Sequence, residues 1–144
     1  MEKRKVMVAL RDTDSTPELV KLACELAAAP GSEVTAVHVV EVTITLDLSA
    51  ESEVLDHPGK EILSLARQVA AENSHPAIKT RLVRARQAGF AIVDEAKEFG
   101  ADLLIIGCRG HHALAEVILG STAHYVAANS TCRVIIQIQP TRKD

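Results

Sequence analysis

The sequence predicts an α/β fold: an open, doubly wound sheet of five parallel strands in the order 3-2-1-4-5, with helices on both faces. Two short, uninterrupted apolar runs, residues 6–10 and 103–106, are typical of parallel strands that are covered on both sides. Between such runs, apolar residues recur with the spacing of amphipathic helices. A chain of 144 residues, of which 47% are apolar, suits a single domain spanning residues 1–144.

The first third of the chain contains two predicted strands, over residues 6–10 and 34–40. Between them, the hydroxyl groups of Ser15 and Thr16 predict the N-cap of a helix, and a proline follows in its first turn. The helical spacing continues to Ala27 and is stopped by a Pro-Gly pair. This part of the chain therefore predicts a strand, a helix and a second strand.

The middle of the chain begins with a polar, acidic stretch, residues 41–59, which has no clear period and predicts a loop with one short helix. Helical spacing returns over 62–70. Residues 78–83 alternate apolar and charged side chains, which suits a strand at the edge of the sheet.

The remaining third completes the alternation of strands and helices. In order, it predicts a helix over 92–99 closed by Gly100, the strand 103–106, a loop with a short helical segment up to Gly120, a helix that starts at Ser121 or Thr122, and a strand over 134–138. Connections between parallel strands are right-handed, so these elements place helices on both faces of the sheet.

Composition excludes several classes of function. The net charge is −3 and aromatic residues make up only 2%, which argues against a nucleic-acid binder or a membrane-surface protein. The three cysteines lack CxxC spacing and suit reduced thiols. No apolar run has membrane-spanning length, and residues 6–10 are too few for a signal-peptide core. We therefore expect a cytoplasmic protein.

One motif carries chemistry: G-x-x-G-x9-G-S, formed by Gly107, Gly110, Gly120 and Ser121, directly after the fourth predicted strand. Glycines let the backbone approach a ligand, take up positive φ and turn amide hydrogens toward phosphate oxygens. Ser121 and Thr122 add hydroxyl groups at a predicted helix N-terminus, which favours anions. In sheets of this kind the ligand lies beyond the carboxyl ends of the strands, here between strands 1 and 4. The motif predicts a phosphate site there.

The chain resembles the universal stress protein (UspA) family, in its ATP-binding subgroup, over nearly its whole length. The resemblance is carried by residues 36–40 (AVHVV), 102–110, 119–123 and 134–136. It implies an adenine nucleotide alpha hydrolase-like fold that binds ATP, ADP or AMP, with Mg²⁺ on the phosphates. The nucleotide-binding residues expected from the motif and the resemblance are Leu10, Asp12, Val39, Ile106, Gly107, Arg109, Gly110, Gly120, Ser121 and Thr122.

The sequence departs from the family at one site position. Arg11 stands where the family usually has an aspartate near the adenine and ribose, and Asp12 follows it. Two outcomes are open. Asp12 takes over with a shifted backbone, or Arg11 points inward and either pairs with phosphate or shuts the pocket.

The resemblance implies a homodimer that pairs through Val134, Ile136 and Ile138 and acts as a sensor or regulator in a stress response. The alternative is a dimeric scaffold with a vestigial pocket that acts through protein contacts. An enzyme is disfavoured, with slow ATP hydrolysis at most, because no convincing base for the attacking water is found. The chain has neither a Walker motif nor the glycine- and serine-rich loop of related ATP-using enzymes after its first strand. His38, on an apolar strand, is expected to be a hydrogen-bonded structural histidine.

Overall fold

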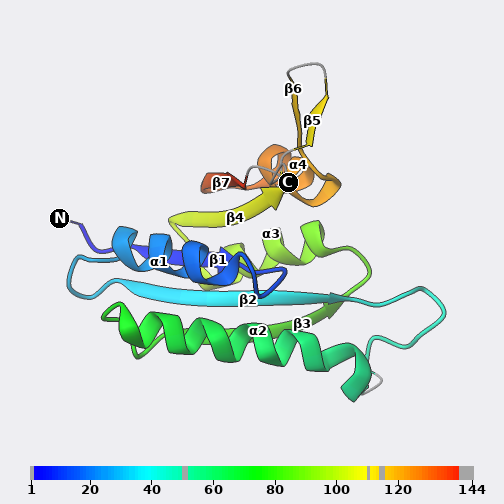
Figure 1. The fold of residues 1–144 in the computed structure, drawn as a ribbon, viewed down its shortest axis with the longest axis horizontal. Helices are drawn as coiled ribbons and strands as arrows, with labels where there is room; N and C mark the ends of the chain where they lie inside the picture. Colours follow the sequence, from blue (N-terminus) through cyan, green and yellow to red (C-terminus); the bar gives the residue numbers. More distant parts are fainter. Residues whose placement is uncertain (1, 50–51, 110, 114–115, 140–144) are drawn as a thin grey trace, which may run out of the picture.

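The computed structural model describes residues 2–49, 52–109, 111–113 and 116–139, with the backbone alone at 109, 111–113, 116–118 and 139. The strands of its main sheet are Lys5–Ala9 (β1), Glu33–Glu41 (β2), Lys79–Ala85 (β3), Leu103–Arg109 (β4) and Arg133–Gln139 (β7). All neighbouring pairs are parallel, in the order β3-β2-β1-β4-β7. The predicted sheet and its strand order are therefore confirmed (Figure 1).

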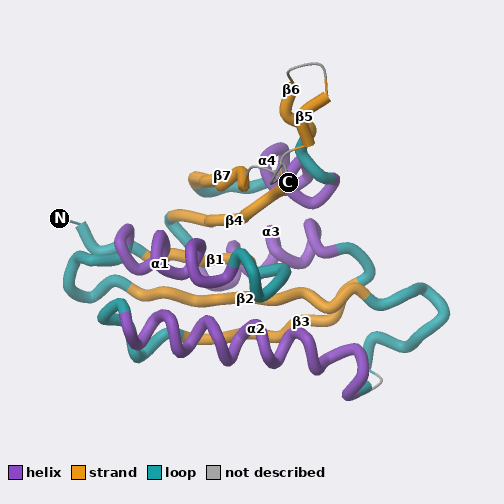
Figure 2. Tube along the Cα trace, viewed as in Figure 1, coloured by secondary structure: helices purple, strands orange, loops and turns teal. Residues whose placement is uncertain are grey.

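In the described part of the chain, four helices cover the sheet: Thr16–Leu26 (α1), Glu53–Glu72 (α2), Ala88–Phe99 (α3) and Ser121–Asn129 (α4). α1 and α2 contribute to one apolar cluster with the sheet, and α3 and α4 contribute to a second one. The helices thus lie on both faces, as predicted. The tube view shows the helices and strands along the chain in separate colours (Figure 2).

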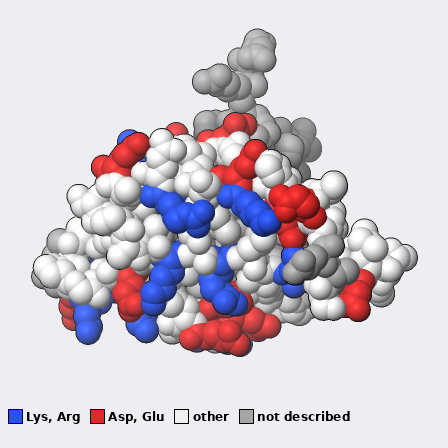
Figure 3. Space-filling view, turned by 90° about the horizontal axis from the view of Figure 1, so that it is seen from below, with Lys and Arg blue, Asp and Glu red and all other residues white. Residues whose placement is uncertain are grey.

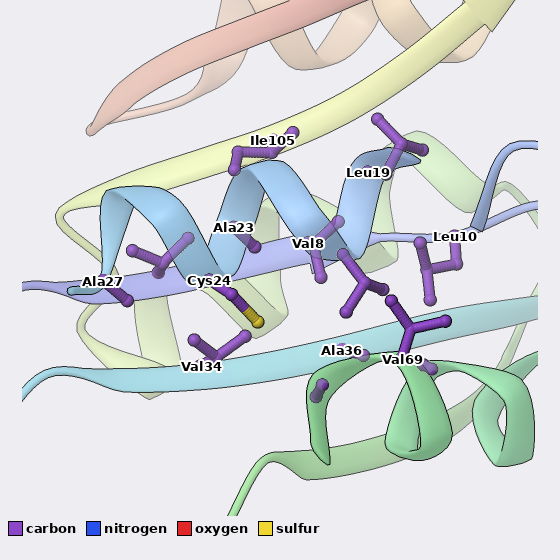
Figure 4. Packing of buried hydrophobic residues seen from close by; sticks show 14 of the residues in the cluster. Val8, Leu10, Leu19, Ala23, Cys24, Ala27, Val34, Ala36, Val69 and Ile105 are labelled. Atoms are coloured by element: carbon purple, nitrogen blue, oxygen red, sulfur yellow. The ribbon is translucent and has the colours of Figure 1, made fainter. Parts of the chain in front are cut away.

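The cluster beneath α1 and α2 is built from small and branched aliphatic side chains. Val8 and Ile105 in the sheet are fully buried against α1, and Val69 closes the cluster from α2 (Figure 4). The sulfur of Cys24 lies within this cluster, which raises the pKa of its thiol, because burial disfavours the thiolate and Glu25 adds a repelling charge. Cys24 therefore packs as a small hydrophobic residue.

The third strand lies at one edge of the sheet, as its alternating sequence predicts. Arg81 extends from β3 toward α3, where its guanidinium forms two hydrogen bonds of 2.9 Å with the carboxylate of Glu95. On the face seen from below the view of Figure 1, Lys and Arg side chains lie next to Asp and Glu (Figure 3). Both signs of charge are therefore mixed on this face.

The predicted loop over residues 41–59 is wrong in its second half, because α2 begins at Glu53 and runs through Pro58. Ser52 caps this helix by accepting a hydrogen bond from the Leu55 amide, 3.3 Å long. Gly59 then allows the helix to lie close to the sheet. A Cβ there would come within 2.6 Å of the ring of His38. Although a Pro-Gly pair usually ends a helix, this pair lies inside α2, and its glycine packs against the sheet.

The segment between Gly107 and Gly120 also differs from the prediction. β4 continues to Arg109, because its last residues pair with β7 up to Gln139. The described residues after it form an antiparallel hairpin, His111–Ala113 (β5) and Glu116–Ile118 (β6), in place of a short helical segment. The hairpin projects from the body of the molecule (Figure 1).

None of the helices in the described ranges combines the length and the apolar character that crossing a bilayer requires.

Candidate functional site

A cleft of about 560 Å³ opens where β1, β2 and β4 end, on the side of the sheet covered by α3 and α4. Ala9, Val37 and Ile106 form its floor, one from each of these strands. The sequence predicts a ligand beyond the carboxyl ends of the strands, between strands 1 and 4, and the cleft lies at that place.

The end of the cleft near β2 is mainly apolar. Val39 from β2 and Ala88 and Ile92 from α3 line it. Ile92 is almost fully buried, and Val39 packs against the same cluster. Such a wall suits a flat, weakly polar group of a ligand.

Another part of the cleft is formed by the start of α4, with Gly120, Ser121, Thr122 and Ala123 among the lining residues. The first hydrogen bond of the helix runs from the amide of His124 to the carbonyl of Gly120, 3.0 Å. The three amides before His124 therefore have no partner within the helix. Unpaired amides and the helix dipole favour an anion at this end.

Leu10, directly after β1, also lines the cleft. Its amide donates to the carbonyl of Val37, 2.8 Å, and its carbonyl accepts a hydrogen bond from Nδ1 of His38, 2.7 Å. His38 is therefore a hydrogen-bonded structural histidine, as predicted. Since a carbonyl can only accept, Nδ1 carries the hydrogen.

Asp12 lies outside the cleft and closes the turn before α1. Its Oδ1 accepts hydrogen bonds from the amide of Ser15, 2.8 Å, and from its hydroxyl, 2.7 Å. The hydroxyl of Thr16 donates to the backbone carbonyl of Asp12, 2.6 Å. Ser15 is the N-cap residue of α1, as predicted, but its hydroxyl does not accept a hydrogen bond from the helix. Both hydroxyls donate hydrogen bonds, and the Asp12 carboxylate accepts from the Ser15 amide instead.

Arg11, between Leu10 and Asp12, is exposed and lines the cleft. It also borders a recess of about 20 Å³ that it shares with Asp12 and Ser15. Of the two outcomes left open by the sequence, the structure places Arg11 at the cleft and Asp12 in the helix turn. Arg11 leaves the cleft open, with its volume of about 560 Å³.

Glu41 ends β2 and is a cleft residue that sequence reasoning missed. Its Oε1 accepts a hydrogen bond from the amide of Ala88, 3.0 Å, and so caps the N-terminus of α3. The sequence feature that could have identified Glu41 is its position directly after the second predicted strand. The partner lies 47 residues away, which no local pattern indicates.

Gly107 and Gly120, the two glycines of the motif that the structure describes, do not adopt the positive φ that we expected. Gly107 lies within β4, and Gly120 has a φ of −67°. Among the described glycines, positive φ occurs at Gly31 and Gly100. Gly107 is small for another reason: a Cβ there would lie 3.0 Å from Cδ1 of the buried Leu19. At Gly120 a Cβ would meet no atom within 4 Å.

Most of the expected binding residues come together at the cleft. Gly110 lies outside the described residues, and Arg109 is described only as the backbone at the end of β4. Cys108 also lines the cleft, but it is buried and packs in the cluster of α3 and α4. The expected residues that line the cleft are Leu10, Val39, Ile106, Gly107, Gly120, Ser121 and Thr122.

Comparison with known proteins gives a consistent assignment. The model described as "Universal stress protein family" matches residues 3–137. The chain is 29% identical to universal stress protein A homolog 2 of Coxiella burnetii, over 92% of this chain and 92% of that protein.

Solved structures share the fold. A universal stress protein in complex with cAMP is 26% identical, with a TM-score of 0.71, over 94% of this chain and 97% of that one. The universal stress protein of Archaeoglobus fulgidus in complex with dAMP has the same TM-score of 0.71 at 22% identity, over 94% and 98% of the two chains.

Proposed function

Because the chain belongs to the universal stress protein family, we propose that its cleft binds an adenine nucleotide, ATP, ADP or AMP. One observation carries the proposal: the cleft joins an apolar end to an end of unpaired helix amides. Its volume of about 560 Å³ suits a small organic ligand. A nucleotide has a flat base and an anionic phosphate, and so matches both ends.

The base lies at the end of the cleft near β2 in this proposal, against Val39, Ala88 and Ile92. The phosphates lie toward Gly120, Ser121 and Thr122, where the amides and hydroxyls of the first turn of α4 can donate to oxygen. The absence of a side chain at Gly120 leaves room for this approach. The related protein solved with cAMP, an adenine nucleotide, supports the assignment.

We further propose that the protein acts as a homodimeric sensor or regulator in the cytoplasm. β7 is the edge strand of the sheet and carries Val134, Ile136 and Ile138, and Ile138 is 42% exposed. An apolar edge strand suits pairing with a second copy. Regulation is preferred to catalysis, because the carboxylate of Glu41 in the cleft is already bonded to the Ala88 amide.

The described residues of the cleft offer few ligands for the Mg²⁺ that is expected on the phosphates. Among the described residues that line the cleft, only Glu41 carries a carboxylate, and it already accepts a hydrogen bond from the Ala88 amide. No group of three His, Cys, Asp or Glu side chains in the described ranges is arranged to hold a metal ion. The described donor set therefore does not fit a cation held by the protein at the phosphate end.

Mass spectrometry of the purified protein tests the proposal by identifying any bound adenine nucleotide. Thermal unfolding with added AMP or ATP provides the second measurement. A ligand present at 100 times its Kd stabilises the folded state by about 2.7 kcal/mol. The result that contradicts the proposal is a protein without nucleotide whose Tm no adenine nucleotide changes, which favours the scaffold alternative.

A matched pair of variants locates the site. Ser121→Glu places a carboxylate in the first turn of α4, where the helix dipole tolerates it but a phosphate is repelled. Ser52→Asp adds the same charge at the N-cap of α2, outside the cleft. Ser121→Glu is expected to abolish the nucleotide-induced rise in Tm, and Ser52→Asp to keep it. Equal responses of the two variants contradict a phosphate site at α4.

A further inference from the structure

The backbone around Arg11 is held on both sides. Leu10 is fixed to β2 by its hydrogen bonds with Val37 and His38. On the other side, Asp12 is fixed to the start of α1 through Ser15. The backbone of Arg11 is therefore held at a defined position, just after β1, the strand between β2 and β4.

Charge is distributed unevenly along the cleft. Of the described residues that line it, Arg11 is the only lysine or arginine, and Glu41 is the only aspartate or glutamate. Glu41 lies at the β2 end, bonded to the Ala88 amide. The positive groups of the cleft are Arg11, in the loop after β1, and the amides that begin α4. A phosphate group is thus favoured between Arg11 and α4.

From this arrangement we propose that Arg11 makes the cleft select nucleotides that carry no divalent cation. This inference rests on the proposed function, the binding of an adenine nucleotide. A guanidinium donates two parallel hydrogen bonds to phosphate oxygens and repels a nearby cation. Mg²⁺ on a nucleotide uses the same oxygens and is usually supported by a protein carboxylate. Arg11 and Mg²⁺ therefore compete for the phosphates.

The ligand class follows from this competition. AMP and cyclic AMP bear a single phosphate group that binds Mg²⁺ weakly, so they enter the cleft without losing a metal. ATP holds Mg²⁺ tightly through its phosphate chain and must give up the ion, or bind with the ion close to Arg11. The cleft thus prefers nucleoside monophosphates and metal-free ATP to the Mg²⁺ complex of ATP.

Isothermal titration calorimetry with adenosine, AMP and ATP, each in EDTA and in excess Mg²⁺, tests the inference. For the wild-type protein, Mg²⁺ is expected to leave adenosine and AMP affinity unchanged and to weaken ATP binding several-fold. Arg11→Gln is expected to lower AMP affinity and metal-free ATP affinity by roughly tenfold or more, the worth of a charged hydrogen bond, and to leave adenosine affinity unchanged.

Arg11→Asp supplies the sharper variant, because it replaces the guanidinium by a carboxylate. Its ATP affinity is expected to be low in EDTA and to rise with Mg²⁺, the reverse of the wild type. Arg67→Gln is the control: Arg67 is an exposed residue on α2 that donates to the Thr80 hydroxyl and does not line the cleft. It is expected to behave as the wild type in every titration.

The inference is overturned if Mg²⁺ tightens ATP binding to the wild type. It is equally overturned if Arg11→Gln weakens adenosine and ATP to the same extent, since Arg11 would then not act on phosphate. A wild-type protein that binds none of the three ligands instead contradicts the proposed function itself. Thermal unfolding of each variant without ligand confirms that the exposed Arg11 is replaced in a folded protein.

Discussion

Nδ1 of His38 lies 2.7 Å from the carbonyl oxygen of Leu10, so a side chain from β2 holds the end of β1 next to Arg11. His38 also contacts α2, where Gly59 leaves room for its ring. One histidine therefore connects the sheet, a helix and the strand end from which the cleft opens.

Replacing this histidine tests that connection. His38→Leu leaves the Leu10 carbonyl without its donor, and we expect the free energy of unfolding to fall by about 1 to 2 kcal/mol in urea denaturation. His57→Leu is the control, because His57 is exposed on α2 and pairs with glutamates in solvent. Its effect is expected to stay within about 0.5 kcal/mol. Equal losses in the two variants contradict a special role for His38.

Asp12 is expected to support α1 and not the ligand. Asp12→Ala removes the acceptor of the Ser15 amide and hydroxyl and should lower stability by about 1 kcal/mol. Asp12→Asn keeps an oxygen acceptor at the same position and should recover most of that loss. Calorimetry should find AMP affinity unchanged in Asp12→Asn. A large loss of affinity in that variant would instead place the Asp12 carboxylate on the nucleotide.

Substitutions at two glycines of one motif are expected to have different effects, one on stability and the other on AMP affinity. Gly107→Val forces atoms against the buried Leu19, so we expect stability to fall by about 1 to 3 kcal/mol. Gly120→Ser meets open space and provides a good N-cap for α4, so stability should be unchanged or slightly higher. The added side chain stands at the phosphate end, and AMP affinity should fall several-fold. Measuring both unfolding and affinity separates the two roles.

Cys24 predicts a dependence of stability on alkaline pH. Burial and the charge of Glu25 raise the pKa of its thiol above the ordinary value, so the folded state keeps the proton to higher pH than the unfolded state. The resulting stabilisation is complete below the unfolded pKa and is lost as the pH rises toward the folded one. The stability difference between wild type and Cys24→Ala should therefore shrink as the pH rises through the ordinary pKa of a cysteine thiol. Urea denaturation at neutral and alkaline pH measures it, and a constant difference contradicts the expectation.

The fold was predictable because its signals are local. The apolar runs of β1 and β4 identify covered parallel strands, and the charges of β3 place it at an edge. The start of α2 was not predictable from Pro58 and Gly59, whose effect depends on His38 and Leu82 in the sheet. Local sequence indicates elements reliably only where tertiary contacts do not decide their ends.

The candidate site divides in the same way. The first turn of α4, with Ser121 and Thr122, follows from a short motif, and the structure places it at the cleft. Glu41 is placed at the cleft together with α3 by its hydrogen bond with the Ala88 amide, which is distant in sequence. The positions of Arg11 and Asp12 depend on a turn that is stabilised by two hydroxyl groups. Which of two neighbouring residues lines the cleft is determined by hydrogen bonds that cannot be predicted from the sequence.

The most direct measurement of the central claim is an NMR titration of the ¹⁵N-labelled protein with AMP, observed at individual backbone amides. We predict that the amide signals of Val39, Ser121 and Thr122 shift together with one Kd, because base and phosphate occupy the two ends of one cleft. Signals on the exposed face of α2, such as that of Arg67, should remain in place. Shifts confined to residues outside the cleft, or no shifts at saturating AMP, contradict the account.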